Sequence, residues 1–571
     1  MKLKRFSIGT LGLLAVSGLA WSCSGKSEDC NANLNCGPYG GGTLGTSGAS
    51  GAAGASSTSG KGGASGTSGT GTSGTGTSGN AGASGEGGTD PTAGAGGVAP
   101  PMCNGSLSPD LDACVISDEY GIFVAPNQDA SADGTQAHPY ATLTTALANV
   151  MKIKHVYVCA ADYAEPDTIE IPDRVSIYGG FTCEGGVWKY DSALPAHLLP
   201  KSPIGARITD AKVGVVIQDV RIDAGNAPDD GTGASSFGMM ISGSQNIALK
   251  RVEIRAGKGG KGKAGIDGAT GLDGIASGTD QNGKAGTCDS APSSRTGPVP
   301  VPKICGSEGG VGGTAQVAAD YSPTQDGLGG YLVAPSNGGK GGQVFGNGAS
   351  RGGDGDKGTP GDKGTAAPAL GAFSATGYQM ASGGSGGAGR PGRGGGGGGA
   401  SLGAASSTAN CLGSTGGAGG MGGCGGDPGG GGIGGGASVG LLSWQSAVTI
   451  DSCALTANTG GAGGNGGAAH IGGAGKAGGT GGPTDSANKV GVGGRGGDGG
   501  NGGNGGNGAG GSGGPSIALV YAGIVPMRVG APSLTFASIA AAAGKGGALG
   551  STEDYGPDGA KGLTQDIYPK P

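Results

Sequence analysis

The stretch "GGRGGDGGNGGNGGNGAGGSGG" (residues 493–514) places a glycine at every third position from Gly493 to Gly514. An extended left-handed helix has three residues per turn, so this spacing aligns the glycines along one edge of the chain. An edge without side chains lets a second backbone approach closely enough for hydrogen bonding. One interpretation of the triplets is a polyglycine-II-like bundle. The alternative is a disordered brush, because glycine loses much conformational entropy on ordering.

Three other tracts repeat this triplet spacing, over residues 259–274, 352–364 and 383–398. Glycine supplies 144 of the 571 residues, and glycine with proline makes up about 30 % of the chain. Collagen is excluded because its triplets are rich in proline, whereas these triplets carry Asn, Ala, Lys, Asp and Gly. Lys and Arg number 35 against 41 Asp and Glu, so no basic face for nucleic acid is expected.

A second pattern recurs between the glycine tracts. Two apolar residues at alternate positions are followed by a two-residue corner and then by two more alternating apolar residues. This pattern occurs in "VVIQDVRI" (215–222), "IALKRVEI" (247–254), "VTIDSCAL" (448–455) and "LTFASIAA" (534–541). A looser version comprises Ile169, Ile171, Val175 and Ile177. Such units predict pairs of short strands that stack into parallel sheets around an apolar column.

The glycine tracts follow these units at corresponding points. Three of the four units run directly into glycine-rich chain. Equivalent corners of stacked repeats lie on one side of the stack, so the tracts are expected to emerge together from one face.

The region before the first repeat has ordinary composition and strand-like segments. These are "GIFVA" (121–125), "HVYVCA" (155–160), "TIEI" (168–171) and "VSIYGG" (175–180). A helix is predicted near residues 142–151, with Thr142 as its N-cap and Leu143, Leu147, Val150 and Met151 on one face.

The N-terminus is typical of an export signal, with basic residues before an apolar run from Phe6 to Leu19. "LAWSC" then resembles a bacterial lipobox, which implies lipidation of Cys23, although Trp21 departs from the usual pattern. The alternative is an ordinary signal peptide cleaved nearby. Ser24 after the cysteine implies sorting to the outer membrane. The following Gly/Ser/Thr-rich residues lack apolar side chains and are expected to form a flexible tether.

Twelve cysteines in an exported chain suggest disulfides. With Cys23 set aside, pairing of sequence neighbours gives Cys30–Cys36, Cys103–Cys114, Cys159–Cys183, Cys288–Cys305 and Cys411–Cys424. Cys453 would then be free and buried in a strand. Sequence alone does not prove this connectivity. A zinc site is the rival interpretation, but there is no C-x-x-C pair and the chain has only four histidines.

The segment "GIFVAP…DGT…HPYATLTTAL…HVYVCAADYAE…VSIYGGF" (121–181) resembles the start of a right-handed parallel β-helix of the pectin-lyase-like superfamily. "GMMISGSQNIALKRVEIRAG" and "VGLLSWQSAVTIDSCALTANTG" look like further coils. Together they resemble glycine-rich, PGRS-like bacterial surface lipoproteins. The resemblance implies an all-β fold, namely a parallel β-helix with an N-terminal capping helix, interrupted by long glycine-rich insertions.

These observations predict the following organisation. The signal peptide spans 1–22, the lipidated N-terminus and tether 23–100, the first part of the β-helix 101–256, a glycine-rich insertion 257–436, a β-helix coil 437–460, a second insertion 461–514, and the last coil with the tail 515–571.

The superfamily contains polysaccharide lyases and hydrolases, whose sites need clustered carboxylates or a basic residue on an outward strand row. The outward candidates are Asp219, Arg221, Asp223, Arg251, Glu253, Arg255 and Asp451. Adjacent coils could place Arg221 near Glu253 and Asp223 near Arg255, which favours a cross-strand ion-pair ladder over a catalytic cluster. The G-x-S-x-G matches at 383–387 and 510–514 lack a strand-to-helix elbow. None of His138, His155, His197 and His470 has an obvious partner.

No catalytic residue, cofactor or metal is therefore predicted. The sequence favours a non-enzymatic exported surface lipoprotein with a structural, adhesive or glycan- and matrix-binding role, held at the outer membrane by a lipid anchor. The alternative is a carbohydrate-active enzyme, a polysaccharide lyase or hydrolase, that uses the outward face of the strands.

Overall fold

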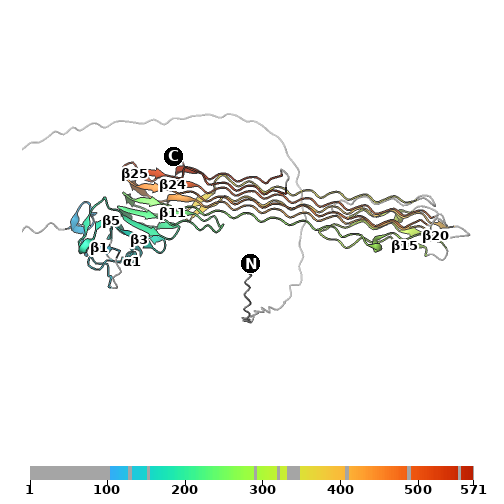
Figure 1. Ribbon diagram of the computed structural model, residues 1–571, viewed down its shortest axis with the longest axis horizontal. Coiled ribbons are helices and arrows are strands. Elements are labelled where there is room, and N and C mark those ends of the chain that lie inside the picture. The colour runs from blue at the N-terminus through green and yellow to red at the C-terminus, as the bar shows by residue number, and fades with distance from the viewer. Residues whose placement is uncertain are drawn as a thin grey trace, which may run out of the picture. The chain divides into compact units, whose positions relative to one another are not determined.

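The computed structural model describes residues 103–569, apart from 127–130, 151–154, 289–291, 318–321, 331–347, 406–409, 485–489 and 551–553. The export signal, Cys23, Cys30, Cys36 and the tether lie outside these residues. The described chain belongs to one compact unit, Gly97–Pro571. Strands gather at one end of this unit, and glycine-rich tracts extend from them (Figure 1).

Three mainly parallel sheets, which we call A, B and C, form the strand-rich part. From residue 204 onward the chain passes through sheets C, A and B in turn and repeats this order. The fold is thus all-β with parallel sheets, as the alternating repeats predicted. Each return to a sheet adds a strand beside the previous one, so residues far apart in the sequence become neighbours.

Sheet A contains, in spatial order, β1 (Gly121–Val124), β2 (His155–Cys159), β5 (Ser176–Thr182), β9 (Val215–Gln218), β12 (Ile247–Lys250), β22 (Val448–Asp451) and β25 (Met527–Val529), with β6 (Lys189–Tyr190) antiparallel to β5. Sheet B contains β3 (Asp162–Glu165), β7 (Ala196–Pro200), β10 (Val220–Asp223), β13 (Glu253–Arg255), β23 (Ala454–Thr456) and β26 (Ser533–Thr535).

Sheet C contains β4 (Ile169–Glu170), β8 (Ile204–Thr209), β11 (Ser236–Ser242), β21 (Ser438–Trp444), β24 (Ser516–Ala522) and β27 (Thr564–Tyr568). Shorter antiparallel pairings join β14 (Thr287–Cys288), β20 (Asn410–Leu412) and β19 (Ala404–Ala405), then β15 (Ser294–Arg295) and β16 (Ala315–Gln316), and finally β17 (Ala372–Ser374) and β18 (Gly377–Gln379).

One apolar core runs between the three sheets. The first three predicted repeats supply it with four buried side chains each, in the predicted alternation. These are Val215, Ile217, Val220 and Ile222; Ile247, Leu249, Val252 and Ile254; and Val448, Ile450, Cys453 and Leu455. Cys453 is free and buried, as predicted.

The two-residue corners between sheets A and B are equally regular. Asp219, Arg251 and Ser452 occupy the second corner position in the three repeats, with φ of 54°, 51° and 53°. A left-handed residue turns the chain sharply enough for the next strand to enter a different sheet. The predicted corner is therefore confirmed in these repeats.

The fourth repeat was predicted with the wrong alignment. Leu534 pairs with Leu455 in sheet B, which corresponds to the second strand of a repeat rather than the first. Phe536 and Ile539, expected inside, are exposed. The first strand is β25, whose "MRV" alternates in the opposite phase, since Arg528 rather than an apolar residue pairs with the buried Ile450.

The predicted N-terminal helix is confirmed as α1 (Leu143–Ala148), and the side chain of Thr142 accepts a hydrogen bond from the Thr145 amide as its N-cap. Leu143 and Leu147 enter the apolar core. Glu165 from β3 supports the helix, because its carboxylate accepts hydrogen bonds from the Leu143 and Thr144 amides. Met151 lies outside the described residues.

The glycine tracts form an ordered bundle joined by backbone hydrogen bonds, so of the two interpretations that the sequence left open the structure agrees with the bundle and not with the brush. We call the tracts 257–283, 350–365, 381–401, 414–437, 459–482 and 493–515 the glycine bundle. Figure 1 shows them side by side between the strands near β11 and the elements β15 and β20. Every third amide donates to a carbonyl of a neighbouring tract. Gly496, Gly499 and Gly502, for example, donate to Gly479, Lys476 and Gly473.

Tract 493–515 bonds to more than one neighbour. Its row from Gly496 to Gly514 donates to tract 459–482, and its row from Gly494 to Ser512 donates to tract 381–401. A Cβ on Gly502 or Gly503 would lie well inside 3.0 Å of a carbonyl group on an adjacent tract. The absence of that atom allows the tracts to pack at hydrogen-bonding distance.

Asparagine and aspartate occupy the third position of the same triplets. Asn501, Asn504 and Asn507 accept hydrogen bonds through Oδ1 from the amides of Gly475, Gly472 and Ala469, at 2.9, 3.3 and 2.8 Å. These side chains take the place of a carbonyl from another tract. The non-glycine positions therefore complete the backbone hydrogen bonding.

The disulfides confirm two predicted pairs and correct two others. Cys103–Cys114 and Cys159–Cys183 are present. The bonds Cys288–Cys411 and Cys305–Cys424 replace the expected Cys288–Cys305 and Cys411–Cys424. The reason is that β14 and β20 are antiparallel neighbours with Cys288 opposite Cys411. Proximity in the bundle, rather than in the sequence, decides the pairing.

Replacing a bundle glycine should destabilise the protein. In Gly503→Ala the new methyl group would collide with the Thr359 carbonyl, and the hydrogen bond from the Gly503 amide to the Arg390 carbonyl would be strained. We expect a loss of about 2 to 4 kcal/mol in the free energy of unfolding, measured by denaturant titration. Gly278→Ala is the control, because that exposed glycine has only the Gln281 side chain nearby, at 3.4 Å. Equal effects of the two variants would contradict the packing argument.

Peptide mapping without reduction should recover Cys288 linked to Cys411 and Cys305 linked to Cys424. Mass spectrometry of the digest before and after reduction provides the measurement. Recovery of a Cys288–Cys305 peptide would contradict the pairing of tracts in the bundle.

Candidate functional site

The outward face of sheet B carries a cluster of charged side chains. Parallel pairing sets Arg221 beside Glu253 and Asp223 beside Arg255, as the repeats predicted. On the other side of β10, Arg221 lies beside His197 of β7, and His197 in turn lies beside Asp162 of β3. We call these six residues the sheet B charge cluster.

The cluster is closely paired. Both ring nitrogens of His197 face carboxylates, with Nδ1 at 2.8 Å from Asp162 and Nε2 at 3.0 Å from Asp223. Arg221 binds Asp223 in bidentate fashion, at 3.0 and 2.5 Å. Arg255 lies 3.2 Å from Glu253 and 3.8 Å from Asp223. Each carboxylate in the cluster therefore lies within 4.0 Å of a histidine or arginine.

Asp223 is the centre of this arrangement. Burial alone would raise the pKa of Asp223, but hydrogen bonds from Arg221 and His197 outweigh burial and lower this pKa. The hydrogen bonds to Asp223 raise the pKa of Arg221. Both shifts favour the charged forms, which suits an ion-pair network and opposes proton abstraction by Asp223.

Asp219 and Arg251 were predicted to lie in the outward row of charged side chains, but they do not. Both lie at corners between strands of sheets A and B, with a left-handed backbone, and the Asp219 side chain is 1 % exposed. Arg251 binds Asp219 at 2.6 and 2.8 Å, and Tyr190 donates a short hydrogen bond to the same carboxylate. Burial and the hydrogen bond to Asp219 raise the pKa of Tyr190 to about 12.

A neighbouring ion pair ties the N-terminal segment to sheet A. Asp110 accepts a 2.7 Å hydrogen bond from Lys250 of β12 and another from Ser108. Burial would raise the pKa of Asp110, but these hydrogen bonds outweigh burial and lower the pKa to about 2. This contact fastens residues close to the first disulfide onto the sheet.

Asp451, the last outward candidate, is not brought to the charge cluster. It ends β22 in sheet A, where it pairs in register with Lys250. The apolar repeats of the sequence did not indicate His197 or Asp162 as members of this cluster. The segment "AHLLP" of β7 buries Ala196 and Leu198 in alternation, and that pattern could have identified the strand.

The other motifs of the sequence supply no reactive arrangement. Residues 383–387 and 510–514, which match G-x-S-x-G, lie in the hydrogen-bonded glycine bundle. In the described chain, Cys103, Asp112 and Cys114 are the group whose potential metal-ligand atoms lie within 4.8 Å of one another. The two cysteines form a disulfide, which removes the thiolates that a metal would need.

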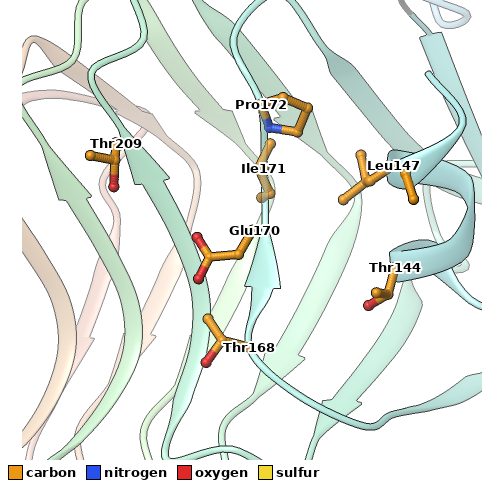
Figure 2. A pocket seen from close by; sticks show the side chains of 8 residues that line it. Thr144, Leu147, Thr168, Glu170, Ile171, Pro172 and Thr209 are labelled. Carbon is orange, nitrogen blue, oxygen red and sulfur yellow. The ribbon is translucent and has the colours of Figure 1, made fainter. Parts of the chain in front are cut away.

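The outer surface of sheet C carries two adjoining hollows. One lies between α1 and β4 and is lined by Thr144, Leu147, Thr168, Glu170 and Thr209, among others (Figure 2). The second lies beside the β17–β18 hairpin, where Thr209, Met240, Ser242, Thr376 and Trp444 form part of its lining. The sequence resemblance predicted a β-helix coil at β21, but no sequence pattern indicated Trp444.

No family model matches this chain, and no curated protein or solved structure matches it. The assignment of function therefore depends on the geometry described above. Among the described residues, no helix has the length and apolar character needed to cross a bilayer.

Replacing Asp110 by asparagine should lower stability in a pH-dependent way. The native pKa of about 2 lies below the ordinary aspartate value of 3.8, so ionised Asp110 stabilises the fold above about pH 4, and this stabilisation is lost as the pH falls toward 2. We expect Asp110→Asn to cost about 1 to 2 kcal/mol at pH 7.

Unfolding titrations at pH 7, 5, 3 and 2 measure this difference. Asp280→Asn is the control, because Asp280 is exposed. A cost for Asp110→Asn that stays constant down to pH 2 would contradict the ion-pair explanation.

Proposed function

We propose that the chain is an exported surface lipoprotein with a structural and adhesive role, anchored at the outer membrane through Cys23 and binding extracellular glycan or matrix without catalysis. The flexible composition of the tether, residues 24–100, would give the rest of the protein reach from such an anchor. Export also agrees with the four disulfides of the described chain.

The glycine bundle is the observation that supports this role most strongly. Its tracts are extended and are joined to neighbours by a hydrogen bond at every third residue, often on more than one side. Cross-linked in this way, the backbone resists bending that a single glycine-rich chain would allow. A stiff polar element with little apolar surface suits a spacer or display structure better than a catalytic domain.

We also propose that the three sheets form a parallel β-helix. The strands visit sheets C, A and B in a fixed order, and α1 covers one end of the shared apolar core. Both features support a right-handed parallel β-helix of the pectin-lyase-like type with α1 as its cap. Strands of this architecture present long outward rows, a suitable platform for binding extended polymers.

A carbohydrate-active enzyme is the second candidate, and the sheet B charge cluster is the observation that favours it. His197 between Asp162 and Asp223 resembles an oriented acid–base group in composition. The pairing of each carboxylate with a basic side chain favours the structural interpretation, because a general base requires a carboxylate available to substrate.

Two measurements test the proposal. Cys23→Ser should abolish incorporation of labelled fatty acid and the labelling of exposed lysines, such as Lys357, by an impermeant reagent on intact cells. The purified protein should co-sediment with at least one insoluble polysaccharide and leave the length of soluble polysaccharides unchanged.

Shortening of a polysaccharide would favour the enzyme instead. In that case His197→Ala should abolish the shortening, whereas Asp451→Asn, on sheet A, should not. Fatty-acid labelling that persists in Cys23→Ser would reject the anchor, and absence of retention on every polysaccharide would reject the adhesive role.

A further inference from the structure

The hollow beside the β17–β18 hairpin has the size of a ligand site. Its volume is about 620 Å³, within the range of small-molecule pockets. Strands β8, β11 and β21 of sheet C form its floor, and Ala375 and Thr376 at the turn of the hairpin form one wall. We call it the Trp444 groove.

The groove is open because the apolar surface of sheet C is only partly covered. Phe373 and Tyr378 of the hairpin pack on the cluster that contains Phe237 and Met240. Trp444 belongs to the same cluster but remains half-buried, and its in-register neighbours on β11 and β24 are the small residues Ser242 and Ala522. An indole ring is thus available on the floor.

Polar groups surround this ring at fixed positions. Asp210, Gly243 and Gln445 follow the ends of β8, β11 and β21, and all three have a left-handed backbone, with φ of 53°, 58° and 48°. The repeated turn places a short polar rim along one side of the groove. Within the described chain, the side chains of Thr209, Ser242 and Gln445 make no hydrogen bond to another residue.

The charges of the groove are compensated. Arg207 forms a 2.7 Å ion pair with Glu170, and Asp210 lies 3.9 Å from Lys212. An anionic polymer would find no unpaired cation here, and a cationic ligand would compete with Lys212. An uncharged ligand with hydroxyl groups suits this lining, because hydroxyls both donate to and accept from Thr, Ser and Gln side chains.

The groove continues into the hollow beside α1. Thr209 lines both hollows. Glu170, the ion-pair partner of Arg207, lines the hollow beside α1, whereas Arg207 lines the Trp444 groove. Figure 2 shows Thr168 and Glu170 near Thr209 on one side of this hollow and Thr144 and Leu147 of α1 on the other. The adjoining hollows cross the strands of sheet C, so they suit an extended chain rather than a compact molecule.

We propose that the Trp444 groove binds a neutral oligosaccharide of β-linked hexopyranose units, with one sugar ring stacked on Trp444 and neighbouring hydroxyls bonded to Thr209, Ser242 and Gln445. A pyranose with equatorial hydroxyls presents an apolar C–H face, which matches an indole, and a polar edge, which matches the rim. This inference deepens the proposed adhesive function by naming the site and the ligand class.

The full chain should be titrated with cellohexaose, chitohexaose and a hexamer of galacturonic acid, with binding followed by calorimetry. We expect at least one neutral hexamer to bind and the acidic hexamer to bind at least tenfold more weakly. Trp444→Ala should weaken the neutral interaction at least tenfold, as expected for an aromatic contact at the centre of a site. Tyr555→Ala is the matched control, because Tyr555 is an exposed aromatic residue outside the groove.

A second variant guards against a folding defect in Trp444→Ala. Thr376→Trp would fill the groove from the exposed hairpin turn without changing a core position, and it should also weaken binding at least tenfold. Absence of binding by either neutral hexamer, preference for the acidic hexamer, or unchanged affinity in both groove variants would overturn the proposal. If Cys23→Ser retained its lipid label, the lipid anchor would be rejected, but binding of a neutral hexamer would still test the Trp444 groove. The anchor and the groove can therefore be rejected separately.

Discussion

The structure depends on the absence of a side chain at two of every three positions in tracts such as 493–515, and at every third position in tracts 257–283 and 350–365. A Cβ at these positions would lie within about 2 to 2.5 Å of a carbonyl oxygen on an adjacent tract, so any other residue would force the tracts apart. Glycine also loses the most backbone entropy on ordering, which means that a single tract could not remain extended alone. The order must be collective: each tract becomes rigid only when neighbours on several sides accept and donate its backbone hydrogen bonds.

Two features reduce the entropic cost of assembling such a bundle. Four of the tracts have one end at a strand of the sheets, as tract 493–515 does before β24, so the apolar core holds these ends close together. Away from the core, Cys288–Cys411 and Cys305–Cys424 link segments more than 100 residues apart in the sequence. The third position of the triplet then completes the amide hydrogen bonds at the surface of a tract, as Asn501 and Asn504 do through Oδ1. The glycine and asparagine residues of these repeats therefore have different structural roles at fixed positions of the triplet, although the composition is that of a low-complexity sequence.

The sequence was most informative where one residue type has one structural use. Alternating Val and Ile around a corner predicted the buried residues of three repeats and the contact between Arg221 and Glu253. The prediction failed where the apolar alternation was out of phase: in β25, "MRV", Arg528 pairs with the buried Ile450, and the apparent repeat at Leu534 was therefore placed one strand too early. Disulfide pairing failed for a different reason, since no local signal indicates that Cys288 and Cys411 lie opposite each other on antiparallel strands. His197 and Trp444 were missed because their surroundings come from neighbouring strands that are distant in the sequence.

The order of the glycine bundle has a consequence for the sheets. The β17–β18 hairpin interrupts the bundle between tracts 350–365 and 381–401, and it folds back onto sheet C through Phe373, whose ring lies 4.9 Å from Tyr378 and 5.7 Å from Tyr568. If the flanking tracts were a disordered brush, this hairpin would be held by its aromatic contacts alone, and Thr376 would have no fixed place at the rim of the groove. Because the tracts are cross-linked on both sides of the hairpin, the wall is set before any ligand arrives, and less conformational entropy is lost on binding. In the proposed binding mode, the glycine repeats would therefore contribute to recognition without providing a single contact to the ligand.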